Sequence, residues 1–198
     1  MFFKTTLDSV ALHQGYNLTP HMVQYRRNLV KGGTYFFTVT LINRNSNLLT
    51  QHIDLLRESV KVVKQRHPFE IIAWVVLPDH LHAVWQLPMD DCDYSNRWRA
   101  IKSHFVRNLK KQGVLINMRA DEFALVWQRR YWEHTIKNED DLRRCVDYCY
   151  INPVKHGLVK AVADWPNSSF HRDVKSGIYP ANWAGINIAI DEGEFGEP

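Results

Sequence analysis

The chain has 198 residues, of which 45% are hydrophobic and 23% are charged, and these average globular proportions exclude a disordered chain. No apolar run approaches the roughly 18 residues that a membrane-spanning helix needs, and no signal-peptide pattern opens the sequence. Three irregularly spaced cysteines, Cys92, Cys145 and Cys149, favour a reducing cytoplasm over a disulfide framework.

The charge is unevenly distributed along the chain. The formal net charge is +4, but residues 191–198 contain four acidic and no basic side chains, so the remaining body carries +8. A basic body with an acidic end is typical of proteins that bind a polyanion, most often nucleic acid. Ordinary solubilising charge would give the same composition, and composition alone does not separate the two interpretations.

The predicted elements follow from the spacing of apolar residues. Residues 1–33 lack clear periodicity and are interpreted as an irregular arm that ends at a Gly-Gly turn. Segments rich in β-branched and aromatic residues predict strands at 34–42, 69–77, 80–87 and 126–136. Apolar residues at helical spacing predict helices at 48–67 and 95–112.

A third helix begins after Asn138, a good N-cap residue, and is expected to end near Ile151, because Pro153 disfavours helical backbone before it. The order of elements is a split βαββαβ pattern followed by this further helix. We therefore expect a ferredoxin-like α+β sandwich, with one antiparallel sheet, helices on one face and an extra helix. Without a repeat or linker, we expect a single domain over 1–198, with an acidic tail at about 185–198.

Two histidines, His80 and His82, stand two residues apart on the third predicted strand. Side chains at that spacing share one face of a strand, so both imidazoles project side by side. Two neutral imidazoles in this arrangement can bind one divalent metal ion. The alternative is a pair of polar residues on a solvent-facing surface of the strand.

Tyr148 and Asn152 lie four residues apart on the last predicted helix and therefore share one helix face. A tyrosine phenol can attack phosphorus when a metal polarises the phosphate, and an asparagine amide oxygen can serve as a ligand to that metal. The alternative is a tyrosine that packs on the sheet and an asparagine that caps the helix.

Basic and aromatic residues are interleaved on the helix at 95–112 and in the segment Trp127–Trp132. Such residues can contact phosphates and stack on unpaired bases, although a solvated helix face explains each of them singly. The candidate DNA contacts are Arg26, Arg27, Arg97, Arg99, Lys102, Arg129 and Arg130. Neither a phosphate-binding loop, a dinucleotide-binding fingerprint nor a GxSxG elbow is present in the sequence.

Several segments, in order, carry a family resemblance. The stretches YRRNLVKGGTYFFTVTLINR, LPDHLHAVWQLP, RRYWEHTI and DYCYINPVKHGLV resemble the single-tyrosine HUH transposases, in particular the branch of REP-associated tyrosine transposases. The resemblance covers residues 25–158. It implies an endonuclease and strand transferase for single-stranded DNA, with a divalent metal ion, Mg²⁺ or Mn²⁺, held by His80, His82 and Asn152.

The resemblance also implies that Tyr148 is the nucleophile, which becomes linked to a 5′ phosphate and frees a 3′ hydroxyl. Tyr150 is a rival by position, but two residues correspond to about 200° of helix rotation, so it cannot share the face of Asn152. The implied substrate is a REP palindrome, a DNA hairpin with a flanking tetranucleotide. Alternatives are a transposase that mobilises its own insertion element and a catalytically silent regulator that binds hairpin DNA.

The acidic tail is expected to lie over the basic groove or the metal site and to compete with DNA. A monomer is favoured over a dimer, because nothing after the tyrosine helix reads as a strongly apolar docking helix. A cytoplasmic, nucleoid-associated location follows from the expected DNA substrate.

Overall fold

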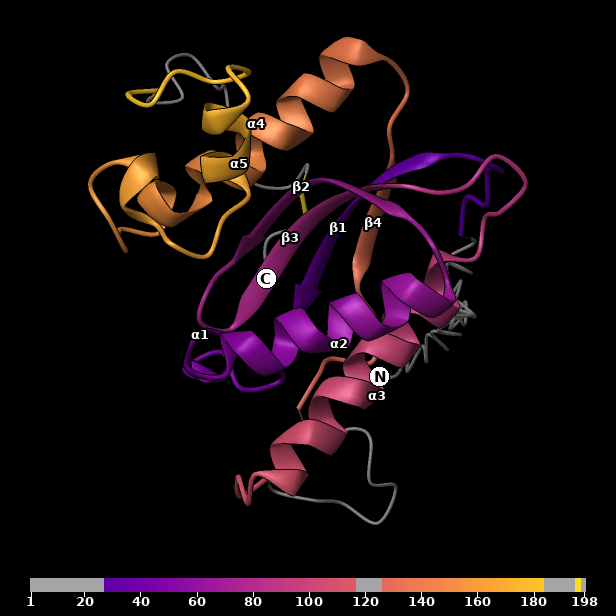
Figure 1. Cartoon of the computed structure of the whole chain (residues 1–198), viewed down its shortest axis with the longest axis vertical. Coiled ribbons are helices and arrows are strands. Elements are labelled where there is room, and N and C mark those ends of the chain that lie inside the picture. Colours follow the sequence, from indigo (N-terminus) through magenta and orange to yellow (C-terminus); the bar gives the residue numbers. More distant parts are fainter. Residues whose placement is uncertain (1–26, 117–125, 184–194, 197–198) are drawn as a thin grey trace, which may run out of the picture.

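The computed structural model describes residues 27–116, 126–183 and 195–196. The elements in chain order are β1 (Thr34–Thr40), α1 (Leu48–Gln51), α2 (Ile53–Arg66), β2 (Glu70–Val76), β3 (His80–Gln86), α3 (Tyr94–Lys111), β4 (Trp132–Thr135), α4 (Glu139–Lys155), η1 (Val162–Asp164) and α5 (Phe170–Lys175). Figure 1 shows α2 and α3 on one side of the sheet and α4 and α5 on the other. None of the helices in the described part is long and apolar enough to cross a membrane.

The four strands form one antiparallel sheet in the order β2-β3-β1-β4, which confirms the predicted α+β fold. β3 lies in the interior of the sheet and pairs with both β1 and β2. Thr38 of β1 lies opposite His82 of β3 on one side and opposite Trp132 of β4 on the other. The histidine strand is therefore held at the centre of the sheet, where its register is fixed from both sides.

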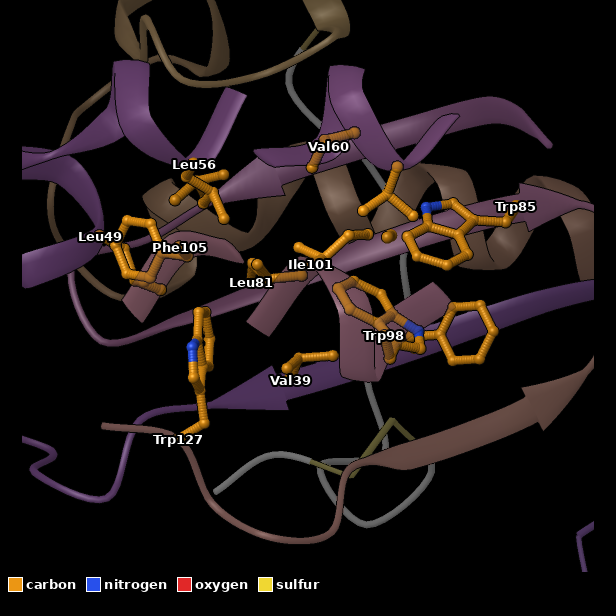
Figure 2. Close-up of a cluster of buried hydrophobic side chains, with 14 of the residues drawn as sticks. Val39, Leu49, Leu56, Val60, Leu81, Trp85, Trp98, Ile101, Phe105 and Trp127 are labelled. Atoms are coloured by element: carbon orange, nitrogen blue, oxygen red, sulfur yellow. The ribbon is translucent and has the colours of Figure 1, made fainter. Parts of the chain in front are cut away.

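Alternation along the strands separates two hydrophobic clusters, one on each face of the sheet. Leu81 and Trp85 of β3 point toward α2 and α3, where Trp85 stacks on Trp98 with ring centroids 4.1 Å apart (Figure 2). The opposite face packs against α4, whose buried residues include Cys145, Tyr148 and Cys149. Since side chains two apart share a face, His80 and His82 must point toward α4.

The helices and strands differ from their predicted limits at three places. The helix predicted at 48–67 is divided at His52 into α1 and α2. The strand predicted at 126–136 is shorter, because ladder pairing with β1 is confined to Trp132–Thr135, and Trp127 forms only an isolated bridge with Leu41.

α4 does not end at Ile151 but continues through Pro153 to Lys155. Pro153 lacks the N–H that would bond to the carbonyl four residues earlier, so α4 continues past it with one intrahelical bond fewer and ends within one further turn. Asn152 is consequently held by regular helix rather than by a loop. The short helices η1 and α5 were not predicted, because neither is long enough to show a period in the sequence.

Candidate active site

His80 and His82 are buried beneath α4, with exposed fractions of 1% and 0%. Their ring centroids are 5.1 Å apart, so the two imidazoles lie side by side as the strand spacing predicts. This burial disagrees with the alternative of two polar residues on a solvent-facing surface. A buried pair of imidazoles needs polar partners, and both histidines have them.

Hydrogen bonds to Nδ1 fix the orientation of both rings. Nδ1 of His80 donates to Oδ1 of Asp79 over 2.8 Å, because a carboxylate can only accept. Nδ1 of His82 lies 2.9 Å from Oγ1 of Thr38, whose hydroxyl donates to the carbonyl of Phe195 over 2.7 Å. Because that hydroxyl has one proton, His82 must donate to Thr38. In both histidines Nε2 is therefore the nitrogen that carries the lone pair.

The pKa values of His82 and Asp79 are shifted in the directions that keep the His82 ring neutral and the Asp79 carboxylate ionised. Burial lowers the pKa of His82 well below its ordinary value, and the neighbouring His80 and His156 lower it further. For Asp79 burial favours the protonated form, but hydrogen bonds and charge from His80 and Arg44 outweigh it and hold its pKa below the usual range. A carboxylate that accepts a hydrogen bond from one ring nitrogen commonly orients metal-binding histidines.

α4 brings Asn152 and Tyr148 to the same place. Asn152 is fully buried and its side chain hydrogen-bonds to His82. The ring of Tyr148 stands edge-on to His82, with centroids 5.3 Å apart. Nζ of Lys155 donates to the Tyr148 hydroxyl over 3.3 Å. The structure thus brings together all four residues that the sequence analysis assigned to the metal and the nucleophile.

Sequence reasoning missed His156, whose ring lies 5.0 Å from that of His80. Burial, with charge from His80, lowers the pKa of His156 to about 4. A signal for it exists in the sequence, because Tyr148, Asn152 and His156 follow one another at intervals of four and share one helix face. Asp79 directly precedes His80, but its role as the acceptor of Nδ1 depends on the geometry of the turn, and Thr38 becomes a neighbour of His82 only through strand pairing.

Tyr150 points away from this site, as the helix geometry predicts. Its hydroxyl donates to Oδ2 of Asp173 over 2.5 Å and lies 3.1 Å from Oγ of Ser169. These contacts attach α5 to α4. Tyr150 therefore has a structural role in joining the two helices.

The end of the chain reaches the same site. Phe195 stacks on Tyr148 with ring centroids 3.9 Å apart, and its ring centroid lies 5.5 Å from that of Phe36. Gly196 follows at a positive φ of 60°, and an added Cβ there would overlap the ring of Trp132. The acidic residues of the tail lie outside the described residues, so only its aromatic contact with Tyr148 is seen.

The candidate DNA contacts fall into different surroundings. Arg26 lies outside the described residues, whereas Arg130 is exposed. Four of the candidates, namely Arg27, Arg99, Lys102 and Arg129, line one pocket on the α3 side of the sheet. This pocket is on the face opposite Tyr148.

Arg97 does not belong to that surface, because it is only 3% exposed. Its guanidinium donates to the carbonyls of Asp93 and Pro68 and to Oδ2 of Asp91, at 2.8, 2.7 and 2.6 Å. The spacing of α3 alone could not show this, since the partners come from the loops before α3 and after α2. Arg97 therefore joins these two loops through hydrogen bonds. Because its guanidinium is buried, it is not part of the proposed DNA-binding surface.

A second cluster of possible metal ligands consists of His134, Asp141 and Cys145. The carboxylate of Asp141 already accepts from Nε2 of His134 at 2.8 Å and from the backbone N–H of Lys137 at 2.9 Å. Arg144 donates to its other oxygen. With its oxygens engaged in this way, Asp141 anchors the first turn of α4 to β4.

The comparisons with known proteins agree with this geometry. Residues 29–150 match the family model described as "Transposase IS200 like". A REP-associated tyrosine transposase of Escherichia coli strain K12 is 51% identical over 173 residues, which are 87% of this chain and 98% of that protein. A Haemophilus influenzae protein is 46% identical over 166 residues, covering 83% of this chain and 94% of its own length.

A solved structure of a REP-associated tyrosine transposase bound to a REP hairpin matches with a TM-score of 0.73 at 53% identity. The match covers 82% of this chain and 92% of that one. The chain therefore belongs to the IS200-like transposases, within the branch of REP-associated tyrosine transposases, and is an enzyme of that class.

Proposed function

We propose that the enzyme is a metal-dependent endonuclease and strand transferase, which cuts and rejoins REP-type palindromic single-stranded DNA through a 5′-phosphotyrosine intermediate. The observation that carries this proposal is the convergence of His80 and His82 from β3 with Tyr148 and Asn152 from α4. Neither element alone contains both a nucleophile and a set of metal ligands. Their packing places the tyrosine beside the histidines.

The donor set fits a divalent metal ion. Nε2 of His80 is buried and has no hydrogen-bond partner among the described residues, which is costly unless a ligand occupies that direction. The ring of His82 lies 5.1 Å from that of His80, and the side chain of Asn152 reaches His82 from α4 through a hydrogen bond. Two imidazoles and an amide oxygen suit Mn²⁺ and also Mg²⁺, which retains several waters.

The bond changes are a single exchange at phosphorus. The Tyr148 hydroxyl releases its proton to solvent as its oxygen forms a bond to the phosphorus, the bond to the 3′ oxygen breaks, and the departing oxygen takes up a proton from solvent to become a free hydroxyl. When bound, a divalent ion supplies charge stabilisation for the phosphate oxygens in this step. The ammonium of Lys155 donates a hydrogen bond to the tyrosine oxygen and so places a positive charge beside the attacking atom.

The phosphotyrosine ester preserves the energy of the broken phosphodiester. A second 3′ hydroxyl can therefore attack it and rejoin strands without a nucleotide cofactor. This accounts for strand transfer by a chain whose sequence contains no phosphate-binding loop.

The substrate is proposed from the chemistry of the surface together with the relative that is bound to a REP hairpin. The exposed arginines Arg99, Arg129 and Arg130 can contact stem phosphates, and the flanking tetranucleotide supplies the single strand to be cut. We further propose that the enzyme acts as a monomer in the cytoplasm, at the nucleoid.

A covalent-complex assay tests the function directly. Full-length enzyme is incubated with a labelled single-stranded REP palindrome and Mn²⁺ or Mg²⁺, and denaturing electrophoresis separates a protein-linked DNA fragment. We expect the adduct with wild type and with Tyr150→Phe, and none with Tyr148→Phe. If Tyr148→Phe forms the adduct as wild type does, the nucleophile is wrongly assigned. Binding without cleavage in either metal would favour a silent DNA-binding regulator.

A further inference from the structure

A pocket with a volume of about 740 Å³ lies between α3 and the segment 127–131, on the face of the sheet opposite Tyr148. Its size falls within the range of about 300–1,000 Å³ that is usual for small-ligand sites. It is lined by Arg27, Trp98, Lys102, Trp127, Gln128 and Tyr131, among others. Nothing in the proposed cleavage chemistry uses this pocket.

Aromatic rings form the walls of the pocket. Trp98 and Trp127 are buried core residues from different elements, as Figure 2 shows, and Tyr131 is half-buried beside them. The Tyr131 hydroxyl is directed to Oγ of Ser95 at 3.3 Å, so the ring is held by its edge. Of these rings Tyr131 is the one that is partly exposed, and an exposed aromatic face can stack on unpaired nucleobases whatever their sequence.

Cations stand over the same rings. Nζ of Lys102 lies 5.2 Å from the centroid of Tyr131 and 5.7 Å from that of Trp127, while the guanidinium of Arg27 lies 4.7 Å from Tyr131. Lys102 donates to the carbonyl of Gln128 over 3.1 Å, and none of the described carboxylates forms an ion pair with it.

Two further arginines, Arg99 and Arg129, are exposed at this pocket. Among the cations of the pocket, Arg27 has a carboxylate nearby, because its Nε lies 3.9 Å from Oε1 of Glu133. The pocket therefore has an excess of positive charge next to aromatic surface. A ligand that suits both features has a flat, polar ring and an anionic group attached to it.

The pocket and the active site lie on opposite faces of the sheet, and β4 is the edge strand at whose start residues of both sites meet. Tyr131 packs in the cluster on the α3 face, whereas the next residue, Trp132, packs in the cluster on the α4 face. The ring centroid of Trp132 lies 5.8 Å from that of Phe36, and the ring centroid of Phe36 lies 5.9 Å from that of Tyr148. Because β4 is the edge strand, a DNA strand that touches both the pocket and Tyr148 has to pass around β4.

We propose that this pocket binds one unpaired nucleotide of the DNA substrate, with its base stacked on the half-buried ring of Tyr131 and its phosphate held by Lys102 and Arg27, while the buried Trp98 and Trp127 support the pocket from below. The proposal rests on the proposed function, since it assumes a DNA hairpin with unpaired nucleotides. It adds a site that anchors the substrate apart from the place of cleavage.

Binding of abasic hairpins tests the pocket independently of cleavage. A fluorescent REP hairpin with a four-nucleotide single-stranded flank is prepared as a series, in which each unpaired position in turn carries an abasic site with its phosphate retained. Dissociation constants are measured by anisotropy with full-length enzyme in chelator, so that no strand is cut. The variants are Tyr131→Leu and Lys102→Met, with Arg107→Met as a control that removes an exposed charge of α3 outside the pocket.

We expect one abasic position to weaken binding by wild type about tenfold, as the loss of a stacked base predicts. Tyr131→Leu should bind the intact hairpin about tenfold more weakly and no longer distinguish that position. Lys102→Met should weaken binding to every hairpin of the series, and Arg107→Met should keep the wild-type dependence on position. If Tyr131→Leu does not fold, the abasic series and Lys102→Met decide the question.

The pocket proposal is overturned if wild type binds every abasic hairpin equally, or if Tyr131→Leu retains the wild-type position dependence. An equal loss in Lys102→Met and Arg107→Met would show general charge attraction and would also overturn it. Failure of the proposed function gives a different result, namely no Tyr148 adduct from a hairpin that binds with the expected position dependence.

Discussion

Phe195 stacks almost parallel on Tyr148, the proposed nucleophile, with ring centroids 3.9 Å and ring planes 10° apart. The carbonyl of Phe195 also accepts the hydrogen bond of Thr38, the residue that orients His82. One residue of the acidic tail thus contacts both the nucleophile and the support of a metal ligand. A phosphate cannot reach the Tyr148 face that Phe195 covers.

We therefore predict that removing this contact accelerates cleavage. Phe195→Ala should raise the initial rate of hairpin cleavage about twofold to tenfold, the change that corresponds to a stacking energy of ~0.5–1.5 kcal/mol. Truncation after Ala184 should raise it at least as much, because it removes the tail charges as well. Rates of covalent-complex formation at low salt provide the measurement.

Gly196→Ala provides a second variant that leaves Phe195 in place. Its Cβ would overlap the ring of Trp132, and the positive φ disfavours any side chain, so the tail should detach. Neutralising the tail carboxylates without changing Phe195 separates charge from stacking. If Phe195→Ala, Gly196→Ala and the truncated chain all cleave at the wild-type rate, the tail is only a solubilising end.

Asp79 is predicted to set the metal affinity through His80. Asp79→Asn keeps the shape but replaces the ionised acceptor that orients the imidazole, so the Mn²⁺ concentration for half-maximal cleavage should rise about 10- to 100-fold. Metal titrations of cleavage, with calorimetric Mn²⁺ binding in the absence of DNA, measure the effect. Asp54→Asn, on the exposed face of α2, is the matched control and should leave both titrations unchanged.

Arg97 is predicted to act on stability and not on DNA binding. Arg97→Met leaves the loop carbonyls of His67 and Pro68 without their donor and Asp91 without its charge partner, which should lower the free energy of unfolding by ~2–4 kcal/mol. Arg99→Met, which changes an exposed residue on the opposite side of α3, should change the free energy of unfolding by less than about 0.5 kcal/mol. Urea denaturation measures both.

Hairpin binding by the two variants supplies the complementary test. Arg99→Met should weaken DNA binding modestly, as loss of one phosphate contact does, whereas folded Arg97→Met should bind as wild type does. A greater loss of affinity in Arg97→Met than in Arg99→Met would return Arg97 to the DNA surface.

Lys102 is predicted to make DNA affinity depend on pH. Burial, with the charge of Arg27, lowers the pKa of Lys102 to about 8, so its ammonium is present below that pH and is lost as the pH rises through it. Because the charged form binds phosphate, affinity should fall between pH 7 and pH 10, with a midpoint above 8, since bound phosphate stabilises the ammonium. Tyr131, whose pKa burial raises to about 12, stays neutral over this range.

Lys102→Arg is the control for this pH dependence, because a guanidinium remains charged throughout the range. Anisotropy titrations of the hairpin should show a flatter pH profile for Lys102→Arg than for wild type. Identical profiles for the two proteins would mean that another group titrates.

The sequence was sufficient for the residues that local periodicity places. His80 and His82 share a strand face because alternation has a period of two, and Tyr148 and Asn152 share a helix face because a helix turns in 3.6 residues. Local geometry of this kind survives tertiary packing with small changes at the ends of elements.

The sequence was not sufficient for partners that meet through folding. Arg97 has the spacing of a surface residue on α3, but two loops supply carbonyl acceptors that bury it. Lys102, on the same helix, meets the aromatic rings of a segment more than twenty residues away. Which cation is structural and which one faces a ligand depends on these long-range contacts.

By itself, the sequence determined the antiparallel fold, the paired histidines and the tyrosine helix, because each follows from short-range spacing and from motifs in a fixed order. Only the tertiary structure decided that β3 and α4 meet at one site, that Asp79 and Thr38 orient the histidines, and that Phe195 covers Tyr148. The physical reason is that packing of buried surfaces and pairing of buried polar groups join residues far apart in the chain, which local spacing cannot specify.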